Sequence, residues 1–380
     1  MKIRPILAAA LLLGAHLSPA FADDAWQFAT MLPLTGGNAG YSTELKLGFD
    51  VAIDEINRAG GIRGRKVELK MMDTQSNPGQ VASLIRSACN DALVVVGPTL
   101  SNEARVAFPV ANSMHCPAIA AAAAAIGLTA NNRPWTFAYL TPSNVATAMV
   151  VDAVVKKVQP KKAVVIIEKG DPSASDFGDM VGKALTSNHI ALDTVTTSSS
   201  DVDFGPTVTR AVSSNPDLIV ISSMDRATVG LLKELRKSQQ HAPILLTQSS
   251  YDGVVGALPP DVLAGVYRYA QSDPASSSDP RAQAFVKDYM SRSGGRAPTL
   301  VSSLTYDTMM LVKDVVEQAG LKGDAASRAS DRQKFIDAMM KVKDWPGAGG
   351  HVTMSPQGYM VKPPLLLQYQ SGKWVQVPEK

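Results

Sequence analysis

The sequence predicts an α/β protein built from two doubly wound units. Three observations indicate this fold. Short apolar segments recur along the chain, segments with helical periodicity separate them, and the alternation starts a second time near residue 163. Such alternation is typical of parallel sheets that helices cover on both faces. With 380 residues, the chain is long enough for two domains with separate cores.

The strand candidates are short apolar runs bounded by polar residues, glycine or proline. They lie at residues 27–33, 66–73, 93–97, 117–121, 163–168, 218–222, 244–248 and 265–270. The segments between them have helical periodicity. In residues 45–56, for example, Leu45, Phe49 and Ile56 share one helix face, and Gly60-Gly61 is a suitable C-terminal stop.

Two joints interrupt the alternation. Residues 141–144 precede a helix predicted at 145–158, and residues 272–280 are rich in Ser, Asp and Pro. Three helices then follow without an intervening strand, at 280–293, 299–320 and 331–341. We expect them to return and cover the first unit. Antiparallel strands are predicted to end the chain, at 351–354, 363–369 and 373–377, with Ser371-Gly372 as a tight turn.

Residues 1–22 are expected to be a secretory signal peptide. Lys2 and Arg4 make a basic start, residues 6–17 are mostly apolar, and Ala20 and Ala22 fit the small-residue cleavage rule. The apolar run is too short for a membrane anchor. Cleavage after Ala22 leaves 35 basic and 34 acidic side chains, and this balance argues against nucleic acid and anionic membranes as partners. We therefore expect a soluble, exported protein.

The glycine-rich stretch 36–40 lacks the signatures of nucleotide binding. It has no Lys-Ser/Thr pair for a P-loop, and it misses the first glycine of the dinucleotide fingerprint. Two interpretations stay open: a turn that needs positive φ, and a loop at a ligand crevice. The chain also lacks a Gly-x-Ser-x-Gly elbow and histidines at metal-ligand spacing. We therefore expect no enzyme, no metal and no cofactor.

Cys89 and Cys116 are the only cysteines, and each precedes a predicted strand. Neighbouring parallel strands could bring the two thiols together, and an oxidising compartment would allow them to pair. The alternative is two buried free thiols. The sequence leaves both interpretations open.

The segment from residue 94 to residue 101 is a candidate anion site. The apolar run Val94–Val96 ends in Gly97-Pro98, and Ser101 stands where the next helix should begin. An N-cap Ser offers its hydroxyl beside the first-turn amides, a combination that binds carboxylates. The alternative is that Ser101 only caps its own helix.

A series of motifs resembles the periplasmic solute-binding proteins of ABC transporters, of the leucine/isoleucine/valine-binding type. The motifs are Pro-Leu-Thr-Gly at 33–36, Asn-x-x-Gly-Gly-Ile-x-Gly at 57–64 and Val-Val-Gly-Pro at 95–98, followed by Ser101. Weaker similarity continues through 117–129, 135–137, 203–204, 217 and 264–265. The resemblance implies two α/β lobes joined by three crossover strands, closing on a solute in the cleft between them.

The resemblance also implies a domain division, a location and partners. The first lobe would comprise residues 23–141 and 272–350, and the second lobe residues 142–271 and 351–380. The protein would be a periplasmic monomer, without a cofactor, that binds a small-molecule carboxylate and presents its closed form to an inner-membrane ABC permease.

In the first lobe, the resemblance carries four positions into the site. Tyr41 stands where the family has an aromatic ring, and Ser101 where a hydroxyl and backbone amides hold the solute carboxylate. Ala122 matches a backbone contact. Ala124 replaces a threonine that grips both the carboxylate and the ammonium of an amino acid.

In the second lobe, the resemblance places Phe177 and Met224 where the family has pocket tyrosines. The acid that binds the ammonium has its nearest match at Tyr251-Asp252, in a loop of different length, so this match is ambiguous. Core packing is the alternative role for Phe177 and Met224.

The replacements at Ala124, Phe177 and Met224 each remove a hydroxyl and leave apolar surface. A buried ammonium would lose partners, which is costly, whereas an aromatic or aliphatic acid would gain a drier wall. We therefore expect an aromatic or 2-oxo acid as solute. A branched-chain or other hydrophobic amino acid, with Asp252 as the anion, is the alternative. A periplasmic sensor subunit without transport and a periplasmic hydrolase are alternatives from other classes.

Overall fold

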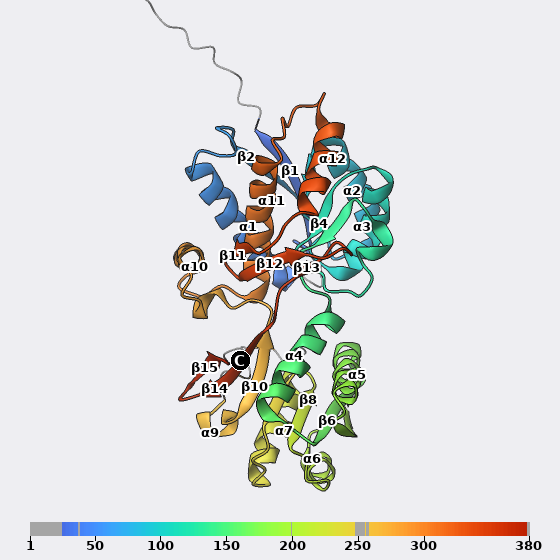
Figure 1. The fold of residues 1–380 in the computed structure, drawn as a ribbon, viewed down its shortest axis with the longest axis vertical. Coiled ribbons are helices and arrows are strands. Elements are labelled where there is room, and N and C mark those ends of the chain that lie inside the picture. The colour runs from blue at the N-terminus through green and yellow to red at the C-terminus, as the bar shows by residue number, and fades with distance from the viewer. Residues whose placement is uncertain (1–24, 37–38, 199, 248–254, 256–257, 378–380) are drawn as a thin grey trace, which may run out of the picture.

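The computed structural model describes residues 25–36, 39–198, 200–247, 255 and 258–377. The first sheet has five parallel strands in the order β2-β1-β3-β4-β5. Their bounds are β1 Trp26–Leu32, β2 Val67–Asp73, β3 Val94–Val95, β4 Ala118–Ala120 and β5 Thr136–Ala138. Figure 1 shows this sheet in the upper part of the molecule.

Six helices accompany the first sheet: α1 Ala39–Arg58, α2 Pro78–Asp91, α3 Ser101–Ser113, α10 Pro280–Arg292, α11 Leu300–Gln318 and α12 Arg328–Met339. Side chains of β1 alternate between two buried cores. Phe28 and Leu32 pack with residues of α1 and α11, while Ala29 and Met31 pack with residues of α2 and α3. The predicted return of the last three helices to the first unit is therefore confirmed (Figure 1).

The second sheet has seven strands in the order β15-β14-β10-β9-β8-β6-β7. Their bounds are β6 Lys162–Lys169, β7 Ala191–Ser198, β8 Leu218–Ser222, β9 Ile244–Leu246, β10 Val266–Ala270, β14 Leu365–Gln370 and β15 Lys373–Gln376. The helices are α4 Ser143–Val158, α5 Pro172–Ser187, α6 Gly205–Val212, α7 Asp225–Lys237 and α9 Pro260–Leu263. Strands β6 and β8 again alternate between two buried cores, one on each face.

The parallel strands of the two sheets have the same spatial order. Taken in sequence order within each unit, both read 2-1-3-4-5, the doubly wound order in which the chain reverses direction beside the first strand. Strands β14 and β15 add an antiparallel hairpin to the second sheet. Its turn is at Ser371-Gly372, where both φ angles are positive (51° and 85°), as a type I′ turn requires. The expected α/β fold with two doubly wound lobes is confirmed.

Three strands near the end of the chain lie in neither of the two large sheets. Strands β11 (Trp345–Gly347), β12 (Gly350–Met354) and β13 (Met360–Val361) form a small separate sheet. The buried side chains of Val352 and Met360 belong to the core of the first lobe. This packing differs from the division that the resemblance implies, because the sequence of a strand does not identify the core that receives it.

Strand β7 is also absent from the predicted strands. It lies at the edge of the second sheet, and most of its side chains are exposed or half-buried. Its sequence, ALDTVTTS, has only three apolar residues and no continuous apolar run longer than two. A continuous run of apolar residues is typical of strands that are buried on both faces, and an edge strand of this kind lacks it.

For the glycine-rich stretch, the structure confirms the interpretation as a turn that needs positive φ. Gly36 has φ of 85°, and a Cβ at this position would lie 2.4 Å from the carbonyl oxygen of Gln75. The turn therefore requires glycine. Helix α1 begins three residues later, at Ala39. The expected signal peptide lies outside the described residues, within which no helix is long and apolar enough to cross a membrane.

Cys89 and Cys116 form a disulfide in the structure, with Cα atoms 5.8 Å apart. The bond connects the end of α2 to the segment just before β4. Both cysteines are buried in the core between the first sheet and helices α2 and α3. Of the two interpretations that the sequence leaves open, the structure has the paired thiols.

Replacing both cysteines, as C89A/C116A, should lower the free energy of unfolding by about 3 kcal/mol, because the bond closes a loop with a sequence separation of 27 in the unfolded chain. Denaturant unfolding of the oxidised protein and the variant measures this difference. Reductant should destabilise the wild type and leave the variant unchanged. Equal stability of both proteins would contradict the prediction.

Candidate ligand site between the two sheets

Both parallel sheets direct the carboxyl ends of their strands toward the segments that join the lobes. Strand β5 ends at Ala138, three residues before Thr141. Strand β10 ends at Ala270, and the next side chain, Gln271, donates from Nε2 to the carbonyl oxygen of Thr141 at 3.4 Å. Because neighbouring strands are parallel, the carboxyl ends of all of them lie on these two edges. The two edges meet at the crossing segments.

Four predicted site residues follow the strands beside the two points where the strand order reverses. Tyr41 follows β1 and Ser101 follows β3, which are neighbours in the first sheet. Phe177 follows β6 and Met224 follows β8, which are neighbours in the second sheet. In open α/β sheets, ligands bind outside the carboxyl ends of the strands at this reversal. The fold thus places these four residues where a ligand is expected.

Helix α3 begins differently from the expectation. Leu100, not Ser101, is the N-cap, and Ser101 is the first helical residue. Ser101 is half-buried, and its hydroxyl makes no hydrogen bond to any other described residue. The amides of Ser101 and Asn102 have no intrahelical acceptor because they begin the helix. A hydroxyl and helix-start amides therefore remain together at this edge, although Ser101 does not cap its helix.

The approach of β3 to β1 depends on a glycine. A Cβ on Gly97 would lie 2.9 Å from the amide nitrogen of Met31 and 3.1 Å from Oγ1 of Thr30. The Thr30 hydroxyl donates to the carbonyl oxygen of Val96 at 2.7 Å. These contacts hold the exit of β3, and with it the start of α3, close to the end of β1.

Ala122 and Ala124 lie in the loop after β4 and are half-buried. The carbonyl oxygen of Ala124 accepts a hydrogen bond from the amide of Ser143 at the start of α4, at 3.1 Å. A cavity of about 130 Å³ lies beside this loop, between residues 123–130 and the start of α4. None of the side chains that line the cavity is charged. This loop therefore offers backbone groups and apolar surface.

Tyr41 and Met224 are unusual for large side chains, because 44% and 41% of their surfaces are exposed. Phe177 is half-buried in the second turn of α5. These exposures do not agree with core packing as the role of Met224. The remaining predicted residues, Tyr251 and Asp252, lie outside the described residues.

Two buried carboxyl groups at these edges are absent from the predicted site. Glu168 ends the apolar part of β6 and is 3% exposed, and its Oε2 accepts a hydrogen bond from the amide of Met224 at 2.7 Å. It has no cationic partner among the described residues. Because Met224 is the N-cap of α7, Glu168 lies at a helix start, which favours its negative charge. The sequence does contain an indication of Glu168, because a charged residue there ends an apolar run.

Glu103 is the second missed group. It lies in the first turn of α3, is fully buried, and accepts a hydrogen bond from the Thr74 hydroxyl at 2.5 Å. Its Oε2 has no hydrogen-bond partner among the described residues. Burial raises the pKa of Glu103, and the nearby Asp73 carboxylate raises it further. In the sequence, Glu103 looks like any acidic residue in the first turn of a helix, so no feature of the sequence indicated that it is buried.

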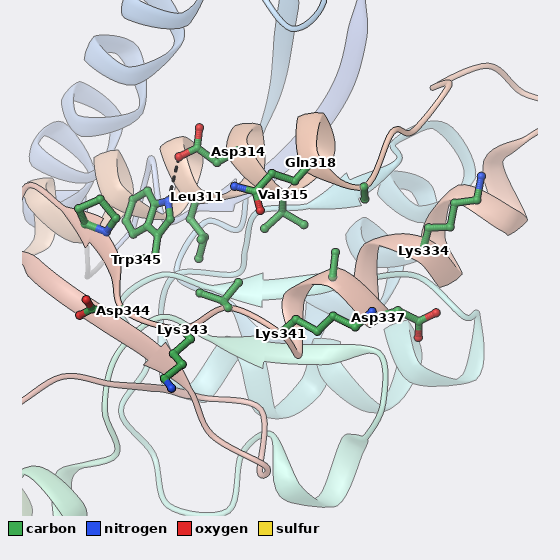
Figure 2. A pocket seen from close by; sticks show the side chains of 14 residues that line it. Leu311, Asp314, Val315, Gln318, Lys334, Asp337, Lys341, Lys343, Asp344 and Trp345 are labelled. Atoms are coloured by element: carbon green, nitrogen blue, oxygen red, sulfur yellow. Dashed lines mark hydrogen bonds between the residues drawn. The ribbon is translucent and has the colours of Figure 1, made fainter.

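A groove of about 650 Å³ lies elsewhere on the first lobe, between α11, α12 and β11. Figure 2 shows the side chains that line it. None of the predicted site residues lines it. Three lysines (Lys334, Lys341, Lys343) and three aspartates (Asp314, Asp337, Asp344) share its wall, and the indole of Trp345 donates to Asp314 at 2.8 Å. With balanced charges, this groove does not favour an anion. No cluster of described residues fits a metal ion either.

Comparison with known proteins identifies the family. A model of the periplasmic binding protein family matches residues 26–373. The chain belongs to this family. A Leu/Ile/Val-binding protein homologue of Brucella melitensis is 26% identical to the binding protein over 386 residues, which cover 99% of each chain. Members of the family are solute-binding proteins and not enzymes.

Solved structures confirm the fold of the binding protein. The branched-chain amino acid transporter substrate-binding protein of Streptococcus pneumoniae, in complex with isoleucine, has a TM-score of 0.70 at 21% identity and covers 93% of this chain and 100% of its own. A solute-binding protein of Rhodopseudomonas palustris, in complex with benzoate, has a TM-score of 0.70 at 20% identity and covers 93% of this chain and 95% of its own. Proteins of this fold thus include complexes with an amino acid and with an aromatic acid.

Glu103→Gln should change how stability depends on pH. Because the pKa of Glu103 is raised in the folded state, the wild type gains stability from protonated Glu103 at low pH and loses it as the pH rises through the raised pKa. The variant, which stays neutral, should therefore gain stability relative to the wild type as the pH rises above 4.5, the ordinary pKa of this group. Urea unfolding as a function of pH measures the gain.

Glu68→Gln, at an exposed position of β2, is the matched control and should leave the pH dependence of stability unchanged. Parallel stability curves for the wild type and Glu103→Gln would contradict the prediction.

Proposed function

We propose that this protein captures a small hydrophobic carboxylate, of the aromatic or 2-oxo acid class, between its two lobes for delivery to an inner-membrane ABC permease. One observation carries the proposal. The free hydroxyl of Ser101 lies at the start of α3 on one strand edge, and the exposed apolar side chain of Met224 lies on the opposing edge.

Anion binding is assigned to the first lobe. The start of α3 provides amides without intrahelical acceptors, a partial positive charge and the Ser101 hydroxyl. The start of α7 in the second lobe is already used, because its N-cap amide donates to Glu168. Of these two helix starts, the one in the first lobe is therefore available to a carboxylate.

The apolar part of the solute is assigned to Tyr41, Phe177, Met224 and the alanine loop. Ala124 has no hydroxyl to offer an ammonium, and the neighbouring cavity has no charged lining. Burial of an aromatic ring against such surface is favourable by about 25 cal/mol per Å². The benzoate complex of a protein with the same fold agrees with this assignment.

A hydrophobic amino acid is the second candidate, and Glu168 favours it. A carboxylate that is 3% exposed and has one backbone donor but no cation among the described residues would gain a partner from a solute ammonium. The Leu/Ile/Val-binding homologue and the isoleucine complex agree with this candidate. A plain acid would leave Glu168 held only by the start of α7.

For solute capture, we propose that the two lobes move as rigid units. The first comprises residues 23–141 and 272–362, and the second residues 142–271 and 363–380. Binding energy gained by contact with both lobes would shift the equilibrium toward the closed form, which a permease or a sensor receptor could recognise. Permease genes beside the gene for this protein would support transport, and a neighbouring histidine kinase gene would support sensing.

Isothermal titration of the purified protein with benzoate and with leucine tests the solute class. We expect binding heat with benzoate and weaker or no binding with leucine, because Ala124, Phe177 and Met224 have no hydroxyl to offer an ammonium. Leucine binding without benzoate binding would overturn the preferred class and support the second candidate. Mass spectrometry of the solute that co-purifies would check both outcomes.

Ser101→Ala should weaken binding of the preferred acid roughly tenfold to a hundredfold, because a hydrogen bond to a charged group contributes about 1.5–3 kcal/mol. Ser113→Ala, at the exposed end of the same helix, is the control and should bind like the wild type. Equal affinities for the Ser101→Ala variant and the wild type would remove the carboxylate from the start of α3.

A further inference from the structure

The three segments that join the lobes are cross-linked at one buried residue, Thr141 of the first segment. Its hydroxyl donates to the carbonyl oxygen of Met360 at 3.0 Å and accepts from the amide of Lys362 at 3.2 Å. Its carbonyl oxygen accepts from Gln271 of the second segment at 3.4 Å. All three segments thus share direct hydrogen bonds.

A buried carboxylate lies beside this junction. Asp307, in the middle of α11, is fully buried and accepts three hydrogen bonds. The amide of Ala348 donates at 2.6 Å, the amide of Gly349 at 2.9 Å and the hydroxyl of Tyr139 at 3.1 Å. Tyr139 belongs to the first joining segment, so α11 holds that segment to the first lobe.

Lys362, in the third segment, is the opposite charge. It is 6% exposed, and its Nζ donates to the carbonyl oxygen of Gly349 at 2.9 Å. The amide of the same glycine donates to Asp307. Gly349 therefore connects the two charges, and each reduces the cost of burying the other.

Gly349 has no room for a side chain. A Cβ there would lie 2.2 Å from Oγ of Ser272 and 3.0 Å from Nζ of Lys362. Ser272 belongs to the second joining segment, and Ser303 of α11 donates to its hydroxyl at 2.8 Å. The second segment is thus also held to α11.

The backbone between these contacts and the second lobe is very short. Helix α4 begins at Ser143, β10 ends at Ala270 and β14 begins at Leu365. Only residues 142, 271 and 363–364 lie between the second-lobe elements and the residues held to the first lobe.

We propose that Asp307, Gly349 and Lys362, together with Ser303, form a clamp that holds all three joining segments to the first lobe and so fixes the axis of lobe motion at residues 142, 271 and 363–364. Without the clamp, the segments could bend on both sides of the junction, and the second lobe would sample more orientations. The clamp concerns the motion on which the proposed function relies, but it exists without solute.

The charge of Lys362 gives the clamp a pH dependence. Burial lowers the pKa of Lys362 to about 8, against the attraction of Asp307. Two other ionisable groups belong to this environment, Tyr139 and Arg281 of α10. Burial raises the pKa of Tyr139, and the positive charge of Arg281 opposes this rise. As the pH rises through about 8, Lys362 loses its proton and Asp307 loses its compensating charge. The clamp should therefore loosen between pH 7 and pH 9.

Distance measurements between spin labels on the two lobes test the clamp in the ligand-free protein. The labels are attached through K334C on α12 and K183C on α5, both at exposed positions. Lys362→Met and Asp307→Asn should each broaden the distance distribution and shift its mean. Lys373→Met, on the exposed β15 hairpin, is the matched control and should leave it unchanged.

The pH profile separates the clamp from a general loss of stability. The wild-type distribution should broaden between pH 7 and pH 9, and that of Lys362→Met should not respond. If neither single variant folds, the D307N/K362M double variant, which buries no charge, takes their place. A wild-type distribution in the folded variants, or no response of the wild type to pH, would overturn the proposal. Because no solute is added, these outcomes are independent of the solute titrations.

Discussion

The direction of parallel strands is the constraint on which the rest of this structure depends. Each sheet is buried on both faces by helices, so its carboxyl edge is where loops can present side chains to a ligand. Strands β5 and β10 lead from these edges into segments that hydrogen-bond to each other through Thr141 and Gln271. The two edges therefore oppose each other across the joining segments, and one solute can contact both.

The two edges differ in charge, although their strand order is the same. The edge of the first lobe offers the start of α3 and the hydroxyl of Ser101, which suit an anion. The edge of the second lobe holds Glu168 at the start of α7, beside the exposed side chain of Met224. In the proposed function, this asymmetry would orient a solute with its carboxylate toward the first lobe. Whether the other end of the solute is a bare ring or carries an ammonium depends on whether Glu168 takes a cationic partner from the solute.

In the proposed function, lobe motion would link solute binding to recognition by a membrane partner. A solute shifts the balance between open and closed forms only by the difference in its affinity for them, so the freedom of the empty protein reduces the apparent affinity. Three joining segments held to α11 through Asp307, Ser303 and Gly349 restrict that freedom. The buried charges at this junction are costly by themselves, and the hydrogen bonds around them make the arrangement specific.

The sequence by itself determined the alternation of strands and helices, the positive-φ turn at Gly36 and the positions of Tyr41, Ser101 and Met224 at strand ends. These features depend on local periodicity and turn chemistry, which neighbouring residues encode. Tertiary structure alone decided that residues 350–361 join the first lobe, that Cys89 pairs with Cys116, and that Glu103, Glu168, Asp307 and Lys362 are buried. Burial and pairing depend on segments that are distant in sequence, and no local pattern reports which of them will meet.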